Sequence, residues 1–465
     1  MRHPVPTRYL AEYAWLPDGV RAEVLLEVED GRFTQVRVLQ HGEDRPGDAR
    51  PLRGVVFPGF ANAHSHAFHR ALRGRTHGLG GTFWTWRQAM YQVAGRLDPD
   101  SYLRLARAVY AEMALAGVTC VGEFHYVHHA PGGRRYDDPN AMAEALRQAA
   151  REAGLRITLL DTAYLAGGLG PDGHTPLDQL QLRFGDGDAE TWAKRVSELR
   201  SSEQLRVGAA IHSVRAVPGS SLGAIAAAAS AGLGGGGGDG GGVGGPDRPA
   251  PVHVHLSEQP AENEACLAYY RRSPAALLAD HGVWSEHATA VHATHLSPED
   301  IALVGGTRTT VCLCPTTERD LADGIGPARA LADAGAPLSL GSDQNAVVDL
   351  LEEARGLESH ERLASLRRGR FTPAELLAAM TAHASLGWAD AGRLAAGARA
   401  DFVVVRRDSV RTAGALPEQI GLAATAADVA TVVVDGTEVV TDGRHRLGDV
   451  AALLTEAVES LWRDS

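Results

Sequence analysis

The sequence predicts an α/β protein, a (β/α)8 TIM-like barrel with a small β-sandwich domain made from both chain ends. Apolar, strand-like runs alternate with helix-like stretches along most of the chain, which is typical of βαβ units and a parallel sheet. Eight such runs suit a closed barrel better than an open doubly wound sheet. Both chain ends instead carry short alternating runs split by Asp-Gly turns, which favours antiparallel hairpins.

Shifts in this pattern divide the chain into three parts. Residues 1–57 should form the N-terminal part of the sandwich, and residues 58–385 the barrel. Residues 386–465 should form the C-terminal part of the sandwich and a terminal helix. The barrel strands are expected within residues 55–66, 118–128, 155–165, 205–216, 251–259, 288–296, 309–317 and 337–344. Helices are expected at residues 98–117, 138–154, 188–202, 221–232, 297–306 and 326–335.

One glycine-rich segment, residues 232–249, interrupts the barrel pattern. It is low in complexity, and no Gly-Lys-Ser/Thr follows it, so it does not match a phosphate-binding loop. It leads from a helix into a strand. We therefore expect a flexible insertion on the barrel face away from the chemistry.

Composition excludes several classes of function. The formal charge of −12 and the scattered arginines argue against nucleic-acid binding. The N-terminus has no apolar signal core and the chain has no long apolar run, so we expect a cytoplasmic protein outside the membrane. The four cysteines are too scattered for a disulfide framework. Cys312 and Cys314 could form a metal pair, but alternate positions of a buried strand favour core residues.

Histidines and carboxylates recur where the predicted barrel strands end. His64 and His66 point to one face of the first strand and could share a metal ion, most often zinc. Because the C-terminal strand ends of a barrel build its active site, later strand ends should supply further ligands. Three imidazoles and a carboxylate suit one zinc ion with an open position for water. The later candidates are His253, His255 and Glu258 on the fifth strand, His292 and His295 on the sixth, and Asp343 on the eighth.

These motifs resemble a known family. The order His-x-His, HLSEQ, HATHL and GSD is similar to that of the metal-dependent amidohydrolase superfamily, in its aminohydrolase branch. More narrowly, five segments resemble the formimidoylglutamate deiminases of histidine degradation: PGFANAHSHAF, FWTWRQAMY, GEFHYVHH, IHSVRAVP and HLSEQPAENEAC. The resemblance covers nearly the whole chain apart from the glycine-rich insertion.

The resemblance implies one divalent metal ion per chain, most often Zn²⁺, although iron or manganese would suit the same donors. Asp343 would accept a proton from the attacking water, and Glu258 would carry a proton to the leaving nitrogen. His292 would hydrogen-bond the developing tetrahedral centre. His253 is then a core residue and His295 a bystander. The implied metal ligands are His64, His66, His255 and Asp343, and the implied catalytic residues are Glu258, His292 and Asp343.

The implied small-molecule substrate is N-formimino-L-glutamate, which carries two carboxylates. Arg215 matches a substrate-binding arginine of the family, and a guanidinium can bind a carboxylate through two hydrogen bonds. Arg87 could serve the same purpose or be a surface arginine on an aromatic-rich loop. His69 stands where some members have glutamine, and its charge would vary near neutral pH. The substrate-binding candidates are Arg215, His212, Tyr126, Arg87 and His69, with Trp84 and Trp86 packing a lid.

Other functions remain in competition. Deamination of a purine such as guanine would use the same metal centre, but it would favour stacking aromatics and amides over an arginine. A non-catalytic scaffold would lack ligands or the proton carrier. A metalloprotease is disfavoured because there is no H-E-x-x-H motif. A homodimer is expected from the resemblance and from the prevalence of twofold assemblies.

Overall fold

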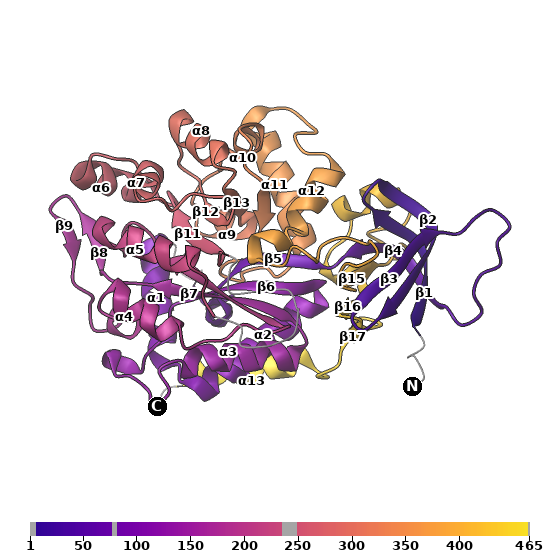
Figure 1. The fold of residues 1–465 in the computed structure, drawn as a ribbon, viewed down its shortest axis with the longest axis horizontal. Helices are drawn as coiled ribbons and strands as arrows, with labels where there is room; N and C mark the ends of the chain where they lie inside the picture. The colour runs from indigo at the N-terminus through magenta and orange to yellow at the C-terminus, as the bar shows by residue number, and fades with distance from the viewer. Residues whose placement is uncertain (1–5, 77–80, 235–248, 464–465) are drawn as a thin grey trace.

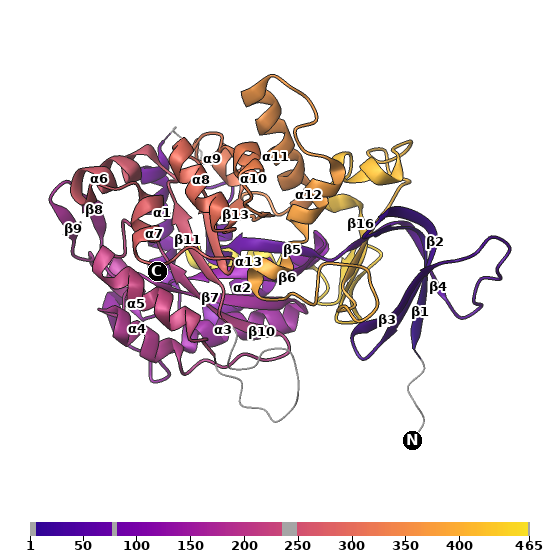
Figure 2. The same ribbon diagram turned by 45° about the horizontal axis from the view of Figure 1, so that its top comes forward.

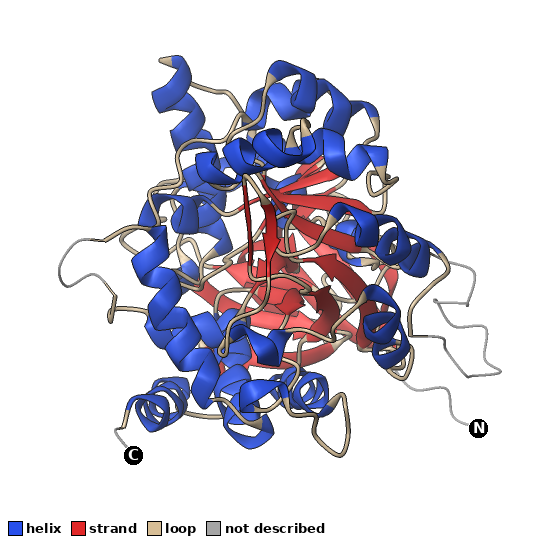
Figure 3. Cartoon of the chain, turned by 90° about the vertical axis from the view of Figure 1, so that its left-hand side faces the viewer, coloured by secondary structure: helices blue, strands red, loops and turns tan. Residues whose placement is uncertain are grey.

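A closed barrel of eight parallel strands forms the larger part of the protein. The computed structural model describes residues 6–76, 81–234 and 249–463. Neighbouring barrel strands follow one another in chain order, with helices around the outside (Figure 3). The barrel predicted from the sequence is confirmed. Its strands are β5 (Phe60–Ser65), β6 (Val118–His125), β7 (Arg156–Ala163), β10 (Leu205–Ile211), β11 (Val252–Leu256), β12 (Ala288–His292), β13 (Thr310–Leu313) and β14 (Leu338–Leu340).

The barrel closes between its first and last strands at candidate metal ligands. Ser65 and Asp343 form a parallel bridge. The Asp343 N–H donates to the His64 carbonyl at 2.9 Å, and the His66 N–H donates to the Asp343 carbonyl at 3.0 Å. The backbone hydrogen bonds that close the barrel therefore also bring three candidate ligands together.

Helices cover the barrel, and several begin with the signals that the sequence carries. The Ser297 hydroxyl accepts the Asp300 N–H at 3.1 Å and caps the helix that starts at Pro298. The aromatic-rich segment around Arg87 is a helix rather than a loop. The helices are α1 (Phe83–Arg96), α2 (Pro99–Leu115), α3 (Ala141–Ala153), α4 (Ala189–Val196), α5 (Gly219–Ser230), α6 (Pro260–Tyr270), α7 (Pro274–Asp280), α8 (Pro298–Gly306), α9 (Pro315–Asp320), α10 (Ala328–Asp333), α11 (Leu350–Ser365), α12 (Pro373–Met380) and α13 (Val450–Trp462).

Both chain ends join in a second eight-stranded sheet beside the barrel (Figures 1 and 2). Its strand order is β18-β17-β16-β15-β4-β1-β2-β3, so β4 and β15 connect the two ends. The Phe33 N–H donates to the Ala398 carbonyl at 2.9 Å, which folds the sheet over its own core. The strands are β1 (Thr7–Leu16), β2 (Gly19–Glu29), β3 (Arg32–Val38), β4 (Arg50–Pro58), β15 (Phe402–Val405), β16 (Val429–Val434), β17 (Thr437–Thr441) and β18 (Arg444–His445).

Strand β4 ties this sheet to the barrel and so positions the first histidines. Its side chains alternate, with Leu52 and Val56 in the core of the sheet and Val55 and Phe57 against the barrel. After Pro58 the chain passes directly into β5. A Cβ at Gly59 would lie 2.4 Å from the Thr119 side chain, so this close crossing requires glycine.

Smaller elements complete the fold. Gly168–Gly170 (β8) and Gly173–Thr175 (β9) form a hairpin, and α13 packs along α2, with Trp462 Nε1 donating to the Ala71 carbonyl at 2.9 Å. The glycine-rich insertion falls between α5 and β11, and most of it, residues 235–248, lies outside the described residues. No helix in the described part of the chain has the length and apolar character needed to span a bilayer.

Candidate metal centre and active site

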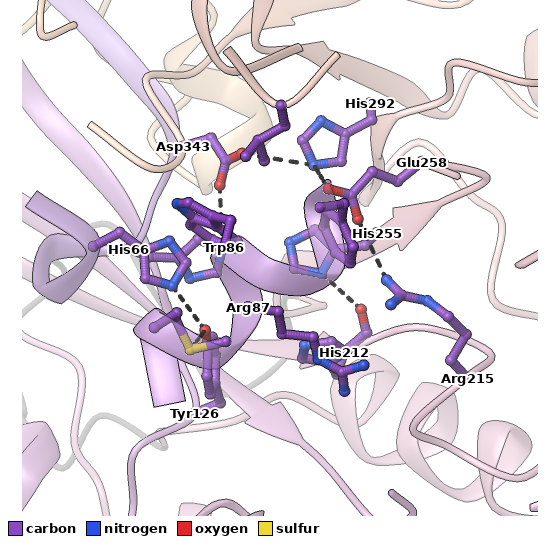
Figure 4. A pocket seen from close by; sticks show the side chains of 14 residues that line it. His66, Trp86, Arg87, Tyr126, His212, Arg215, His255, Glu258, His292 and Asp343 are labelled. Carbon is purple, nitrogen blue, oxygen red and sulfur yellow. Dashed lines mark hydrogen bonds and ion pairs between the residues drawn. The ribbon is translucent and has the colours of Figure 1, made fainter. Parts of the chain in front are cut away.

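Four buried side chains converge at the C-terminal end of the barrel. His64 lies on β5 and His66 directly follows that strand, His255 lies on β11, and Asp343 follows β14. Asp343 Oδ1 lies 3.3 Å from His64 Nε2 and 3.4 Å from His66 Nε2. His255 Nε2 lies 3.2 Å from His64 Nε2. Figure 4 shows His66, His255 and Asp343 turned toward one another.

The tautomers of two of these imidazoles are fixed by backbone carbonyls. His66 Nδ1 lies 2.9 Å from the Phe124 carbonyl oxygen, and His255 Nδ1 lies 2.8 Å from that of His212. A carbonyl only accepts, so each Nδ1 carries the proton and donates it. Each Nε2 therefore presents its lone pair to the centre, as in metal sites whose histidines are oriented by an outer hydrogen bond.

The charge states of the cluster also suit a cation. Burial lowers the pKa of His64, and burial with neighbouring histidines lowers that of His255 well below its usual value. Burial alone would raise the pKa of Asp343, but the hydrogen bond to His64 and the nearby imidazoles hold it far below its ordinary range. Neutral imidazoles and an ionised carboxylate are the forms that bind metal.

These residues fit one divalent metal ion. His64, His66 and His255 offer ligand atoms within 4.8 Å of one another, and so do His64, His292 and Asp343. Three imidazoles with one carboxylate match zinc, and iron or manganese less specifically. Cys312 and Cys314 pack in a small apolar cluster and belong to no group of candidate ligands among the described residues.

Glu258 and His292 stand over the centre as candidate proton carriers. His292 Nε2 lies 3.8 Å from both Glu258 Oε1 and Asp343 Oδ2. Burial raises the pKa of Glu258, so this carboxyl can hold a proton nearer neutral pH. Burial would lower the pKa of His292, but the carboxylates of Glu258 and Glu318 raise it well above its usual value. His292 has φ 67°, a strained backbone of the kind found at functional sites.

A cavity opens beside these groups. Helix α1 forms one wall, and strand ends of the barrel form the others (Figure 4). The cavity brings together two arginines, several imidazoles, aromatic rings and the candidate proton carriers. Its lining residues are His66, His69, Phe83, Trp86, Arg87, Met90, Tyr126, His212, Arg215, His255, Glu258, His292, Leu321 and Asp343.

The two cavity arginines have different surroundings. Arg215 Nε donates to Glu262 Oε2 at 2.7 Å, and its Nη2 donates to Glu258 Oε2 at 3.3 Å. Arg87 Nη2 donates to the Tyr164 hydroxyl at 3.1 Å. Among the described residues, no carboxylate pairs with Arg87. Its guanidinium is therefore the cavity cation with the least compensated charge.

Aromatic and imidazole side chains define the rest of the cavity wall. His69 Nε2 lies 2.9 Å from the Tyr126 hydroxyl. Burial lowers the pKa of His69 to about 3, so the imidazole is neutral near pH 7 and the expectation of a variable charge is wrong. Trp86 lines the cavity, whereas the side chain of Trp84 is 45% exposed and does not.

Two strand-end histidines lie outside this constellation. His253 Nε2 donates to the Ser385 carbonyl at 3.2 Å, and His295 Nε2 donates to the Asp323 carbonyl at 2.7 Å. Neither lines the cavity.

Two buried glutamates were not anticipated from the sequence. Glu318 Oε1 lies 3.6 Å from His292 Nδ1 and accepts the Cys314 N–H at 2.8 Å. Glu262 binds Arg215 from the first turn of α6. Glu262 shares a helix face with the buried Cys266, four residues on, and that spacing is the one signal that could have indicated its burial.

A second group of candidate ligands, His125, His128 and Asp161, lies outside the barrel wall. His128 Nε2 donates to the Thr162 carbonyl at 2.9 Å, and His128 Nδ1 lies 3.3 Å from His125 Nε2. Asp161 is bound by Arg195 and Trp192. The atoms of this second group that could bind a metal ion therefore already take part in hydrogen bonds and ion pairs within the protein.

Comparison with known proteins extends these observations. The sequence model of the Amidohydrolase family matches residues 55–439. The chain is 34% identical to a formimidoylglutamate deiminase of Pseudomonas aeruginosa, over 94% of this chain and 95% of that protein. It is 28% identical to an 8-oxoguanine deaminase of the same organism, over 94% of both. The fold matches an adenosine deaminase from Xanthomonas campestris with bound zinc, at a TM-score of 0.80 and 22% identity, over 99% of this chain and 98% of that one.

Proposed function

This chain belongs to the amidohydrolase family, and from that premise we propose that it hydrolyses N-formimino-L-glutamate to N-formyl-L-glutamate and ammonia. The family and the deaminase relatives make it a hydrolase of C–N bonds. The substrate, and zinc as the metal, are our proposals. The 34% identity over nearly the whole length of a formimidoylglutamate deiminase supports the first, and the three-imidazole donor set supports the second.

One observation carries the choice of substrate. Two guanidinium groups, Arg87 and Arg215, line the cavity beside the candidate metal centre. The proposed substrate has two carboxylates, and arginine is the side chain best suited to bind them through paired hydrogen bonds. A neutral purine would offer no carboxylate to either arginine, and Arg87 would keep only the Tyr164 hydroxyl as its hydrogen-bond acceptor. His212, Tyr126 and His69 complete the proposed binding site.

The side chains around the centre can carry the proton transfers. A divalent ion held by His64, His66, His255 and Asp343 would activate a water molecule near neutral pH. Asp343 accepts the proton of the attacking water. Glu258, whose raised pKa lets it hold a proton, protonates the imine nitrogen. As the tetrahedral centre collapses, the proton on Asp343 passes to the same nitrogen and the hydroxyl proton returns to Glu258, so that ammonia departs and both carboxyl groups regain their starting state. His292 donates a hydrogen bond from Nε2, which faces both Glu258 and Asp343, to the tetrahedral centre.

A purine substrate is the competing proposal inside the same chemistry. It is favoured by the similarity to the 8-oxoguanine deaminase and by the aromatic side chains of Phe83, Trp86 and Tyr126 in the cavity. Such rings can stack on a base. The two arginines weigh against it.

Ammonia release tests the proposal. Zinc-loaded protein should release ammonia from N-formimino-L-glutamate, but not from guanine or 8-oxoguanine and much less from N-formimino-glycine. Arg215→Met should retain metal and lose about 10- to 100-fold in kcat/KM, because charge-assisted hydrogen bonds are removed. Release from a purine alone would overturn the substrate and leave the metal centre in place. A cytoplasmic location and a homodimer are further parts of the proposal, and sedimentation of the purified chain tests the second.

A further inference from the structure

Glu262 is a buried carboxylate that joins two parts of the proposed active site. Its side chain is 0% exposed. Oε2 accepts from Arg215 Nε at 2.7 Å, and Oε1 accepts from the Ser257 N–H at 2.8 Å. Ser257 precedes Glu258, the proposed proton carrier, and has φ 48° in the left-handed region. One carboxylate thus holds both the cavity arginine and the strained loop that carries Glu258.

The hydrogen bond between Glu262 and Arg215 Nε determines which edge of the guanidinium a substrate can reach. Glu262 occupies Nε, and the Phe83 ring lies 5.8 Å from the Arg215 Cζ atom. None of the described residues accepts a hydrogen bond from Nη1. A substrate carboxylate would therefore bind at the edge formed by Nη1 and Nη2. There it would compete with Glu258, whose contact with Nη2 is the longer one at 3.3 Å.

We propose that Glu262 is a positioning residue that directs Arg215 toward a substrate carboxylate and leaves Glu258 only the longer contact with that arginine, so that a bound substrate can release Glu258 for proton transfer. The inference rests on the proposed function. One guanidinium here faces two carboxylates, and the shorter contact is with Glu262. Without the Glu262 charge, Glu258 becomes the main partner of Arg215. The arginine then turns from the substrate, and the proton carrier is held in an ion pair.

A double-mutant cycle tests this role in the zinc-loaded, full-length protein. Glu262→Gln should raise KM and lower kcat for N-formimino-L-glutamate, with a combined loss of about tenfold or more. The Glu262→Gln/Arg215→Met variant should lose no more than Arg215→Met alone, because both changes act through the same guanidinium. Glu264→Gln is the matched control, since Glu264 is exposed on the same helix. It should behave as the wild type.

Two outcomes would overturn the inference. If Glu262 only stabilised the fold, Glu262→Gln would leave KM unchanged and reduce the fraction of active molecules. The losses in kcat/KM of the two single variants would then multiply in the Glu262→Gln/Arg215→Met variant. Equal behaviour of the Glu262→Gln and Glu264→Gln variants would also exclude the role.

Calorimetric binding of N-formyl-L-glutamate separates this inference from the proposed function. If the wild type binds N-formyl-L-glutamate but releases no ammonia from the proposed substrate, the proposed function is wrong. The role of Glu262 is then decided by the same double-mutant cycle, measured on the affinity for N-formyl-L-glutamate. If ammonia is released but the cycle is additive, the function stands and the inference fails. If the wild type neither binds nor reacts, both are overturned.

Discussion

Two buried clusters of histidine and aspartate lie on opposite sides of the barrel wall. The inner cluster contains His64, His66, His255 and Asp343, and the outer cluster contains His125, His128 and Asp161. Candidate ligand atoms lie within 4.8 Å of one another among the three inner imidazoles and among the three residues of the outer cluster. Their composition and burial are alike, so neither property explains why only the inner cluster suits a metal ion.

The clusters differ first in where their lone pairs point. In the inner cluster, His66 and His255 donate outward through Nδ1 and leave Nε2 free toward the centre. In the outer cluster, His128 donates through Nε2 to a carbonyl, so its Nδ1 accepts from His125. A metal ion at the outer cluster would have to break hydrogen bonds that the inner cluster does not need to break.

They differ also in how the carboxylate is compensated. Arg195 lies 2.8 Å from both Asp161 and Asp186, so the outer cluster already contains its cation. The carboxylate of Asp343 has only imidazole partners among the described residues. In the proposed metal site the inner carboxylate would be compensated by the bound cation, whereas the outer one is compensated by Arg195 of the protein itself.

The largest expected effect separates the two clusters by metal content. His66→Gln should reduce zinc affinity by about a thousandfold or more, since even outer-shell changes at metal sites cost 10- to 100-fold. His128→Gln should leave one zinc per chain. Elemental analysis and competition with a chelator measure both. Equal zinc loss in the two variants would mean that the outer cluster takes part in metal binding.

The next effect concerns turnover at constant metal content. Glu258→Gln should lower kcat by about a hundred- to a thousandfold, because general acid–base catalysis contributes about that much. Zinc content and binding of N-formyl-L-glutamate should persist. His128→Gln is the matched change in the outer cluster and should retain turnover. A wild-type rate for the Glu258 variant would show that another group carries the proton.

The barrel and the inner cluster could be predicted because both follow from strand geometry. A period of two places His64 and His66 on one face, and parallel strands bring their C-terminal ends to one edge. Once the structure is known, the alternation of side chains along a strand also explains where the outer cluster lies. Phe124 packs against His64 and His66, so His125 must point to the other face of β6.

Glu262 and Glu318 could not be predicted in this way. Both lie on helices that follow a strand, where a glutamate is ordinarily exposed. Their burial depends on the placement of Arg215 and His292, which belong to other elements. Such contacts are set by tertiary packing, and the spacing of Glu262 and Cys266 on one helix face indicates burial but not the partner.

Arg195→Met tests the internal cation of the outer cluster. The change leaves Asp161 and Asp186 buried without their guanidinium, and breaking a buried pair from one side costs about 3 kcal/mol or more. Urea denaturation should show this loss, while metal content stays at one zinc per chain. Arg147→Met, at an exposed pair with Glu144, is the control and should change stability little. A second bound zinc in the Arg195 variant would show that arginine alone had excluded metal from the outer cluster.

The smallest effect distinguishes the clusters by pH. Burial lowers the pKa of His128 to about 4, below the value of about 6.5 of an unfolded histidine. The unfolded state therefore binds an extra proton below about pH 6.5, so the contribution of His128 to the free energy of unfolding is complete above that pH and is lost as pH falls toward 4.

His128→Gln keeps a donor for the Thr162 carbonyl but cannot titrate. Between pH 6.5 and 5, its free energy of unfolding should fall by about 2 kcal/mol less than that of the wild type at equal zinc content. His41→Gln, at an exposed histidine, is the surface control for the substitution itself. Identical slopes for the wild type and the His128 variant would mean that the outer cluster already holds its proton in the folded state, and that it is closed to metal by charge as well as by geometry.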